Sequence, residues 1–505
     1  MVPGAWCSFS AKSWKLAFLL LLAGACAALA LPPVYLFPIL PLSLGVLYRA
    51  ASDAPSMRWA ALWGGVFGMG FHTAGLYWLT NAILTRVHDF WWVIPFAAPG
   101  VALVIAPLIA IPAMVCRLVR PGWPRVFVFS GVWSLSDMSR ALIFSGFPWN
   151  PLGSALELPG RVGDILIQPA SVIGVHGLSL VLVLASLALW HGRRAVLAVA
   201  LGSVLWCGYG IWRLDVETPL PVSNPYLVLA QGNVSEDDVL DHEDALDNFR
   251  SYLRLTSEGV AKAHRKVNDR SIVVVWPESA FPGLLDEDIS ARQAMAIAAD
   301  GAPILAGSDR RSRGYWYNSL EVVSPDGDIE AIYDKSRLVP FGEYQPWILP
   351  FNILPIVLTP GPGLVTWDLP QIGRVGPMVC YEIIFSGSVV KSGQRPNWLL
   401  TISNDAWYGN SAGPRQHLAT GRMRAVEEGL PVVFANNRGV SAVYDSNGHE
   451  TIRTYWGKEE VVDCYIPSPG NKTLFSYFGN AIDIFISLIF IVFPFIKKIR
   501  NNYYK

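Results

Sequence analysis

The sequence predicts two structural parts, a multi-pass α-helical membrane domain with about eight transmembrane helices and an extracytoplasmic α/β domain. Three observations lead to this fold class. The 505 residues are 52% hydrophobic and only 15% charged, a composition typical of membrane proteins. Long apolar runs fill residues 1–212 and recur near the C-terminus. Between them, short β-branched runs alternate with helical patterns.

The apolar runs have the length that crosses a hydrocarbon core, about 20 residues for a helix. We expect them at 14–31, 34–49, 58–80, 91–115, 124–146, 168–190, 194–212 and 480–496. The first run follows Lys12 and Lys15 and ends in small residues, as a signal peptide does. A second run begins almost at once, which favours a retained helical hairpin. The N-terminal membrane domain is therefore expected over 1–212 with about seven transmembrane helices, and a C-terminal helix with a basic tail over 479–505.

Lys and Arg in the short connections predict the orientation, because positive residues concentrate on the cytoplasmic side. With the expected helices, one side receives Lys12, Lys15, Arg49, Arg58, Arg117, Arg120, Arg125, Arg193, Arg194, Lys497, Lys498 and Arg500. Seven crossings from an inside N-terminus place residues 213–478 on the opposite, periplasmic side. The eighth helix returns the C-terminus to the cytoplasm.

The polar segment 213–478 is expected to form a layered α/β domain. Strands are predicted at 226–234, 271–275, 303–307, 319–323, 374–380, 398–403 and 431–435, and helices at 243–266, 288–299 and 414–428. Chemistry in such folds lies at strand ends, so polar or reactive residues there are candidates for a site.

Composition excludes several classes of function. Lys plus Arg equals Asp plus Glu at 39 each, so no basic excess indicates a nucleic-acid partner. The six cysteines form no CxxC pair and no cluster with histidine at metal-ligand spacing. A disulfide framework or a structural zinc site is therefore not expected.

Three reactive residues follow predicted strands, in the order Glu278, Lys335, Cys380. Taken singly, Cys380 is also compatible with a buried packing residue, and Lys335 with a solvated lysine at a strand end. Glu278 is more informative, because a carboxylate directly after an apolar strand is unfavourable unless it is paired or used. Together, a carboxylate base, a cation for an oxyanion and a thiol nucleophile are sufficient for acyl transfer through a thioester.

The motifs around these residues resemble known families. Segment 226–465 resembles the nitrilase or carbon–nitrogen hydrolase superfamily, through Trp276-Pro277-Glu278, Tyr333-Asp334-Lys335 and Val379-Cys380-Tyr381-Glu382. The wider chain resembles the apolipoprotein N-acyltransferase family, which joins such a domain to eight membrane helices. That resemblance includes Leu338-Val339-Pro340-Phe341-Gly342-Glu343, Ser403-Asn404-Asp405-Ala406-Trp407, Gln416-His417 and Gly146-Phe147-Pro148-Trp149. It implies a nitrilase-like αββα sandwich for the periplasmic part.

The resemblance also implies roles. Glu278 would be the general base, Lys335 the oxyanion stabiliser and Cys380 the nucleophile that becomes a thioester. Glu343 would orient or assist Lys335. Tyr381 and Glu382 would shape the pocket and accept polar groups of a substrate. No metal and no organic cofactor would be needed, because side chains supply every role.

The implied reaction transfers a fatty acyl group from a phospholipid to the N-terminal amine of the S-diacylglyceryl-cysteine of an apolipoprotein, at the bacterial inner membrane. The implied partners are the phospholipid donor, the diacylglyceryl apolipoprotein and the bilayer. One alternative is a membrane-tethered amidase or nitrilase acting on a small substrate. Another is a transporter or lipid-binding protein with a degenerate extracytoplasmic domain.

The segment Trp347–Leu358 is almost devoid of charge and is followed by Gly361-Pro362-Gly363. An exposed apolar segment of this size is unusual in a soluble enzyme. We interpret it as a flexible lid that dips into the outer leaflet and gives a lipid tail access to Cys380. The alternative is a loop packed in the core.

Overall fold

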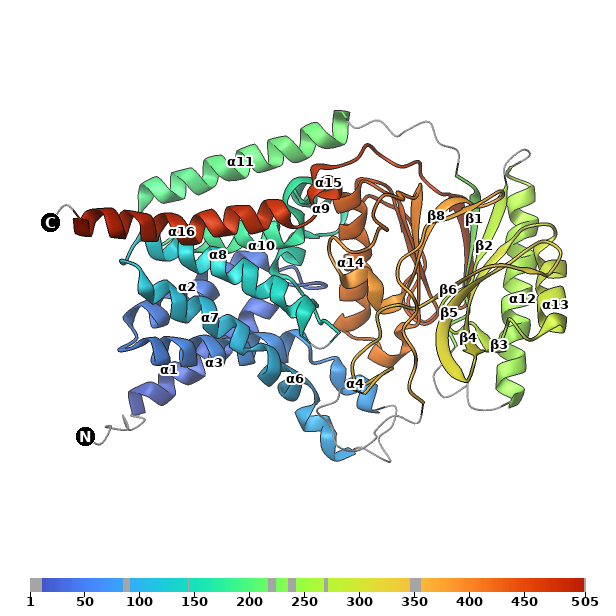
Figure 1. Cartoon of the computed structure of the whole chain (residues 1–505), viewed down its shortest axis with the longest axis horizontal. Coiled ribbons are helices and arrows are strands. Elements are labelled where there is room, and N and C mark those ends of the chain that lie inside the picture. Colours follow the sequence, from blue (N-terminus) through green and yellow to red (C-terminus); the bar gives the residue numbers. More distant parts are fainter. Residues whose placement is uncertain are drawn as a thin grey trace.

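The computed structural model describes residues 11–84, 91–143, 145–216, 224–234, 242–267, 271–345 and 356–503. Two parts lie side by side, a bundle of helices and a layered α/β domain (Figure 1). The helical part contains both the N-terminal segments and the last helix, so the chain leaves the bundle, forms the α/β domain and returns.

Each of the eight expected apolar runs lies in a helical region. The helices of this part are α1 (Ala11–Ala28), α2 (Leu40–Asp53), α3 (Met57–Gly75), α4 (Leu79–Leu84), η2 (Trp91–Phe96), α6 (Ala97–Ile105), α7 (Pro107–Val115), α8 (Trp123–Ser139), α9 (Gly160–Ile167), α10 (Ala170–Ala188), α11 (Arg193–Val216) and α16 (Ala481–Tyr503). The run expected at 91–115 is divided into three elements, since Pro95 lies inside η2 and Pro107 begins α7.

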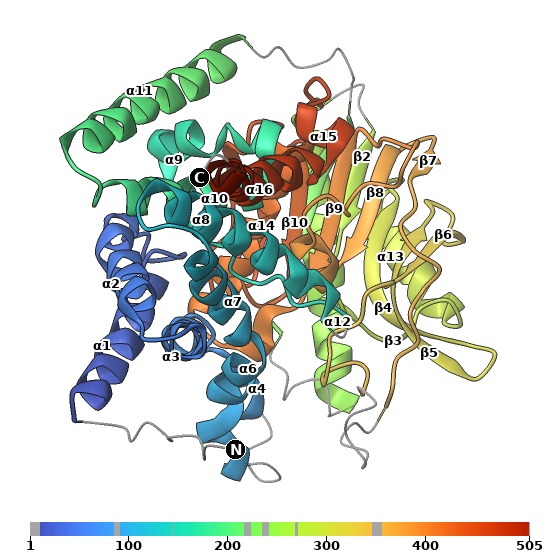
Figure 2. The same cartoon turned by 60° about the vertical axis from the view of Figure 1, so that its left-hand side comes forward.

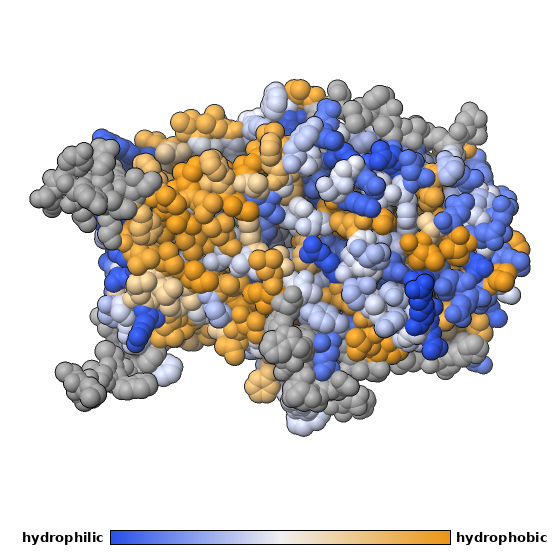
Figure 3. All heavy atoms as spheres, in the orientation of Figure 1, coloured by the Kyte–Doolittle hydropathy of each residue, from blue (hydrophilic) through white to orange (hydrophobic). Residues whose placement is uncertain are grey.

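Within the described residues, three helical segments are long and apolar enough to cross a membrane: Trp91–Leu118, Ala170–Ala188 and Arg193–Val216. Ser13–Ala28 and Ala481–Phe495 are shorter apolar helices. The coarser prediction of an apolar helical part is thus confirmed, whereas eight crossings stay a prediction. Apolar residues cover much of the helical part on the face drawn in Figure 3, and hydrophilic residues predominate on the α/β part.

The α/β part contains two sheets in the described chain. The first has the order β13 (Glu460–Tyr465), β1 (Tyr226–Gln231), β2 (Ile272–Val275), β4 (Ile304–Ser312), β5 (Tyr315–Val323) and β6 (Ile329–Asp334), with β3 (Phe281–Leu284) also pairing with β4. The second has the order β12 (Glu450–Arg453), β11 (Ala442–Tyr444), β10 (Val432–Asn436), β9 (Trp398–Ser403), β8 (Gly373–Val379) and β7 (Trp367–Leu369). The seven strands with expected bounds are all present, and β6 is the strand expected, without bounds, before Lys335; β3, β7, β11, β12 and β13 were not anticipated.

The two sheets pack face to face through fully buried side chains, such as Val275 and Leu305 from the first sheet and Val379 and Leu400 from the second. Helices α12 (His242–His264) and α13 (Ile289–Ala299) cover the outer face of the first sheet, and α14 (Ala412–Glu428) lies on the second (Figure 1). This α-β-β-α layering confirms the expected sandwich. The strands that end beside the candidate residues, β2, β6 and β8, all have their last residues in or next to the core between the sheets.

The helical part docks on the α14 side of the sandwich. On α14, the Gln416 amide accepts from the indole Nε1 of Trp78 at 2.9 Å and of Trp149 at 3.0 Å. Farther along the same helix, Arg422 forms a 2.6 Å ion pair with Asp164 of α9. Figure 2 shows α14 between the sheets and the bundle. The second sheet, which carries Cys380, is therefore the one next to the helical part.

Candidate active site

The fold brings together the three residues singled out from the sequence. Lys335 Nζ lies 3.4 Å from Glu278 Oε1 and 2.6 Å from Glu343 Oε1. Both Glu278 and Lys335 act electrostatically on the Cys380 thiol. Glu278, Lys335 and Cys380 are 6%, 1% and 7% exposed, so their charges interact in a largely water-free environment.

Glu278 follows β2 through Trp276 and Pro277, and its carboxylate is held from two directions. Oε1 accepts from Asn318 Nδ2 at 2.7 Å, and Oε2 accepts from the backbone N–H of Asn404 at 2.8 Å. Asn318 belongs to β5 of the first sheet, while Asn404 follows β9 of the second. The carboxylate thus bridges the two sheets, and its orientation is fixed by both.

Lys335 follows β6, and its ammonium group lies between two carboxylates. Burial lowers the pKa of Lys335, but the carboxylates of Glu343 and Glu278 outweigh that effect, so its pKa lies above the ordinary value. The Glu343 carboxylate also accepts from the backbone N–H of Val339 at 2.8 Å. Burial raises the pKa of Glu343, Lys335 lowers it and Glu278 raises it, with a net upward shift. Lys335 therefore remains a cation, oriented by Glu343.

Cys380 stands at the turn between β8 and a short 3₁₀ helix. Its φ is +52°, a left-handed conformation that a non-glycine residue rarely adopts. A residue keeps such a strained conformation only where the surrounding contacts hold the turn in place. The structure ends β8 at Val379, one residue earlier than expected, because the chain turns at the cysteine itself.

The thiol of Cys380 keeps its proton in this buried site. Burial raises its pKa well above the ordinary value, Glu278 raises it further, and Lys335 opposes the shift. Ser403 Oγ lies 3.4 Å from Sγ. A thiol in this state needs a base to become a nucleophile, and Glu278 is the carboxylate whose charge acts on it most strongly.

Glu382 links the turn at Cys380 to the strand that precedes Lys335. Its Oε1 accepts from the Tyr333 hydroxyl at 2.7 Å, from the Ser336 backbone N–H at 2.8 Å and from the Ser336 hydroxyl at 2.5 Å. Its Oε2 accepts from the backbone N–H of Val379 at 2.8 Å. These protein donors occupy the carboxylate, so its geometry favours a positioning role over the expected contact with substrate.

Tyr381 points from the same turn to the helical part, where its hydroxyl donates to the carbonyl of Gly146. Ser145 Oγ donates to the carbonyl of Leu338 at 3.0 Å. The segment that precedes Trp149 therefore contacts both the Cys380 turn and the chain that follows Lys335.

Sequence reasoning gave no role to the pair His417 and Asp405, which lies next to the backbone of Cys380. His417 Nε2 is 3.1 Å from the carbonyl of Cys380, and Nδ1 is 2.9 Å from Asp405 Oδ1. The imidazole thus joins the Asp405 side chain to the backbone of the Cys380 turn. Ser403 Oγ and Asn436 Nδ2 also donate to Asp405, at 2.9 and 2.6 Å. The motifs Ser403-Asn404-Asp405 and Gln416-His417 contain both residues. Nothing in the sequence around either motif indicated that the two side chains contact each other.

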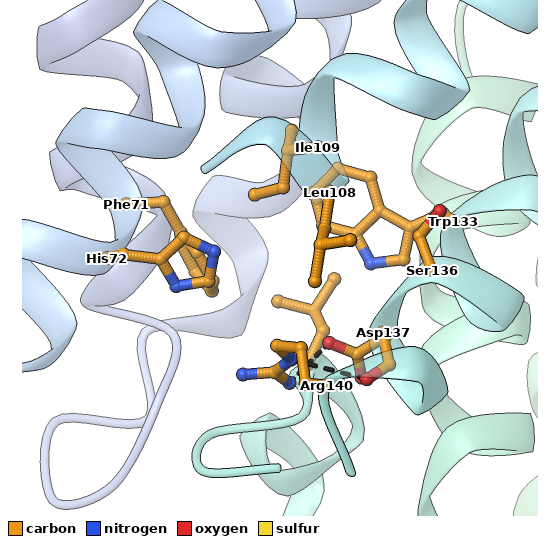
Figure 4. Close-up of a pocket in the computed structure, with 9 residues that line it drawn as sticks. Phe71, His72, Leu108, Ile109, Trp133, Ser136, Asp137 and Arg140 are labelled. Atoms are coloured by element: carbon orange, nitrogen blue, oxygen red, sulfur yellow. Dashed lines mark hydrogen bonds and ion pairs between the residues drawn. The ribbon is translucent and has the colours of Figure 1, made fainter. Parts of the chain in front are cut away.

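A polar cluster inside the helical part is connected to the candidate active site through Trp149. Arg140 forms an ion pair with Asp137 and donates to the carbonyl of Trp149. Figure 4 shows Asp137 and Arg140 joined in this way, with His72 on the other side of a small cavity. The indole of Trp149 packs against the His417 ring, with centroids 5.4 Å apart. The helical part therefore supports the turn at Cys380 through Trp149 and His417.

The expected lid falls mostly on residues 346–355, which lie outside the described residues. Of its described part, Ile356 and Val357 are 50% and 54% exposed. The backbone N–H of Leu358 donates to the carbonyl of Glu343 at 2.9 Å. The end of this segment thus joins the loop that orients Lys335. Among the described residues, no group of three His, Cys, Asp or Glu side chains is arranged to hold a metal ion.

Comparison with known proteins matches both parts. Residues 23–188 match the family model of the apolipoprotein N-acyltransferase N-terminal domain, and residues 238–469 match that of carbon-nitrogen hydrolase. An apolipoprotein N-acyltransferase of Allorhizobium ampelinum is 35% identical, covering 86% of this chain and 87% of the relative. One from Rhodopseudomonas palustris is 34% identical over 93% of each chain. This chain belongs to the apolipoprotein N-acyltransferase family. The joined pair of domain types, aligned over nearly full length, also separates the chain from the soluble members of the carbon–nitrogen hydrolase superfamily.

Proposed function

We propose that this chain transfers a fatty acyl group from a phospholipid to the N-terminal amine of the S-diacylglyceryl-cysteine of an apolipoprotein, through a thioester on Cys380. The observation that carries the proposal is a buried thiol under the joint influence of Glu278 and Lys335, on the sheet that packs against an apolar helical bundle. Family membership supports the same activity over that of a tethered amidase or nitrilase.

In the first half-reaction, Glu278 takes the proton of the Cys380 thiol and the thiolate attacks the carbonyl carbon of the phospholipid ester. Lys335 stabilises the negative charge that develops on the carbonyl oxygen, as a preorganised donor in a water-poor site does. The carbon–oxygen bond then breaks. The lysophospholipid leaves as an alcohol after its oxygen receives the proton from Glu278, and the acyl group remains on Sγ.

In the second half-reaction, the α-amine of the apolipoprotein cysteine attacks the thioester carbon. Glu278 accepts a proton from the attacking nitrogen and returns it to the thiolate as the carbon–sulfur bond breaks. The products are an amide and the free thiol of Cys380. Glu343 keeps the Lys335 ammonium in place in both halves, because it is its nearer carboxylate partner at 2.6 Å.

The positioning of the nucleophile supports a substrate that arrives from the membrane. The Cys380 turn is held by Glu382 within the sandwich and by the Tyr381 contact with Gly146 of the helical part. An enzyme that hydrolysed small soluble molecules would not need its nucleophile fixed to an apolar bundle. A lipid ester lies near the headgroup plane, where these two parts meet.

We place residues 213–478 in the periplasm and both termini in the cytoplasm. The positively charged connections support this orientation by lying together at one end of the bundle. The backbone carbonyl of Ser52, in the last turn of α2, accepts from Arg117 at 2.6 Å and from Arg125 at 3.1 Å. The rings of Trp123 and His191 are 5.1 Å apart, which brings the connection after α10 to the same end. Alkaline phosphatase fused after residue 300 is expected to be active and fused after residue 505 inactive; the reverse pattern would overturn the topology.

Mass spectrometry of Cys380 tests the chemistry. The purified full chain, incubated with phospholipid alone, is expected to gain one acyl group on Cys380 and to lose it when a diacylglyceryl lipopeptide with a free amine is added. Cys380→Ala is expected to form neither thioester nor amide. An intact thiol after incubation, with release of ammonia from small amides instead, would support the hydrolase alternative.

A further inference from the structure

Asp309 on β4 carries a carboxylate near the candidate active site that the mechanism above does not use. The strand reaches the site at Gly307, because a Cβ on Gly307 would lie 2.7 Å from the Cα of Glu278. In a strand, residues two positions apart face the same side and lie about 7 Å apart. Asp309 therefore faces the same side of the sheet as Gly307 does, one step farther along β4 from Glu278.

The strand register places Asp309 next to Asn318. The two residues are direct partners between β4 and β5, which are neighbouring antiparallel strands of the first sheet (Figure 1). The side chains of such partners share one face of the sheet, with Cβ atoms about 5 Å apart. Asn318 Nδ2 donates to Glu278 Oε1 at 2.7 Å. Asp309 is thus one side chain away from the proposed base of both half-reactions.

Asp309 lies at the mouth of the site. It is exposed, whereas its strand partner Asn318 is 6% exposed. The next pair on the same face, Arg311 and Trp316, lies farther out along the two strands, with the guanidinium 5.6 Å from the ring centroid. A substrate group that enters along this face therefore meets Asp309 before it reaches Glu278.

Asp309 adds negative charge to this mouth. Glu278 and Glu343 share one cation, the Lys335 ammonium. Both carboxylates act electrostatically on Asp309, and among the described residues no cation is paired with it. Partial removal from water, and then Glu278 and Glu343, raise the pKa of Asp309 to about 6, so its side chain is an anion at neutral pH. A cationic substrate group is attracted to such a position, and a phosphate is repelled from it.

We propose that Asp309 binds the α-ammonium of the diacylglyceryl apolipoprotein and presents it to the thioester on Cys380. A free α-amino group has a pKa of about 8, so the acceptor arrives mostly protonated at neutral pH. A charge-assisted hydrogen bond from this ammonium to Asp309 selects an acceptor with a free N-terminus. No covalent bond forms in this step: the ammonium releases one proton to water, and Glu278 accepts the second during attack, as described above. The assignment rests on the proposed function and makes Asp309 a recognition residue for the second half-reaction.

Separating the two half-reactions tests this assignment. The full chain is loaded with an acyl group from phosphatidylglycerol, a donor without an amine. A diacylglyceryl lipopeptide with a free amine is then titrated, and mass spectrometry follows the loss of the Cys380 thioester. Asp309→Asn is expected to form the thioester at the wild-type rate but to need about tenfold more lipopeptide for half-maximal aminolysis, the effect of one charge-assisted hydrogen bond. The rate at saturating lipopeptide is expected to stay unchanged, and Asp309→Glu is expected to restore most of the affinity.

Controls separate recognition from a general defect. Asp328→Asn makes the same change at an exposed aspartate in the turn between β5 and β6, and it is expected to behave as the wild type does. Hydroxylamine, a small neutral nucleophile, is expected to cleave the thioester of Asp309→Asn and of the wild type equally fast. Slower cleavage in Asp309→Asn would show a general defect at the site and overturn the recognition role.

Two further outcomes would also overturn the recognition role. One is an equal half-maximal lipopeptide concentration for Asp309→Asn and the wild type. The other is slower thioester formation in Asp309→Asn from phosphatidylethanolamine but not from phosphatidylglycerol, because Asp309 would then bind the ammonium of the donor headgroup. If the wild-type chain forms no thioester with either donor, the proposed function itself fails, whereas a normal thioester with an unchanged lipopeptide requirement removes only the role of Asp309.

Discussion

Replacing Glu382 with Gln is expected to destabilise the α/β domain and to misplace the nucleophile. The carboxylate accepts from Tyr333, Ser336 and Arg337 through Oε1 and from Val379 through Oε2. A glutamine carbonyl can replace one oxygen, but its NH₂ group then faces a donor. If the carbonyl takes the Oε1 position, the backbone N–H of Val379, next to Cys380, loses its acceptor.

The magnitude follows from these contacts. A buried N–H left without a partner costs about 1–3 kcal/mol, and each donor that exchanges a charged acceptor for a neutral one loses about 1 kcal/mol. With Glu382 1% exposed, water cannot compensate. We therefore expect a loss of roughly 4 kcal/mol or more in the free energy of unfolding, in the tail of single-substitution effects.

Thermal unfolding in detergent, followed by tryptophan fluorescence, measures the stability, and mass spectrometry of Cys380 measures thioester formation. Glu330→Gln is the matched control, because Glu330 is exposed on β6 and the same change there removes a solvated charge. The variant at Glu382 is expected to melt well below this control and to form thioester slowly. Equal melting temperatures and equal rates for the two variants would refute the positioning role of Glu382.

The remaining predictions concern the charges around the nucleophile. Glu278 raises the pKa of Cys380 and Lys335 lowers it, so the pH at which iodoacetamide alkylates Cys380 is expected to fall in Glu278→Gln and to rise in Lys335→Met; shifts in the same direction would contradict the assigned charges. Lys335→Met is also expected to slow thioester formation about a hundred- to a thousandfold. A rate close to that of the wild type would contradict the role of Lys335 as the oxyanion stabiliser. His417→Leu, which removes the ring nitrogen that contacts the Cys380 carbonyl, is expected to slow thioester formation about ten- to a hundredfold, with partial rescue in His417→Gln. If His417 and Asp405 act as a pair, Asp405→Asn is expected to slow thioester formation about as much as His417→Leu does. A wild-type rate in Asp405→Asn would show that the two side chains act separately.

Local sequence was sufficient to predict the strands that end beside the reactive residues. Short β-branched runs before Glu278 and Cys380 predicted β2 and β8, since strands of this kind are buried on both faces and end where a turn residue follows. The apolar runs predicted the helical regions for a similar reason, because their length alone distinguishes them from soluble helices. The short strands β7, β11 and β12 were missed, since three or four residues carry too little alternation to be recognised.

The reactive residue types and the elements that carry them could be read from local sequence, because where a strand or helix forms and ends depends mainly on neighbouring residues in the chain. The contacts that hold those residues in place, in contrast, depend on how distant segments pack together. The Glu278 carboxylate meets the Asn404 N–H across 126 residues, and His417 reaches the Cys380 carbonyl across 37. Tyr381 finds its partner in the helical part, 235 residues away. No periodicity encodes such contacts, since they arise only when two sheets and a helical bundle pack together and each buried polar group must find a partner.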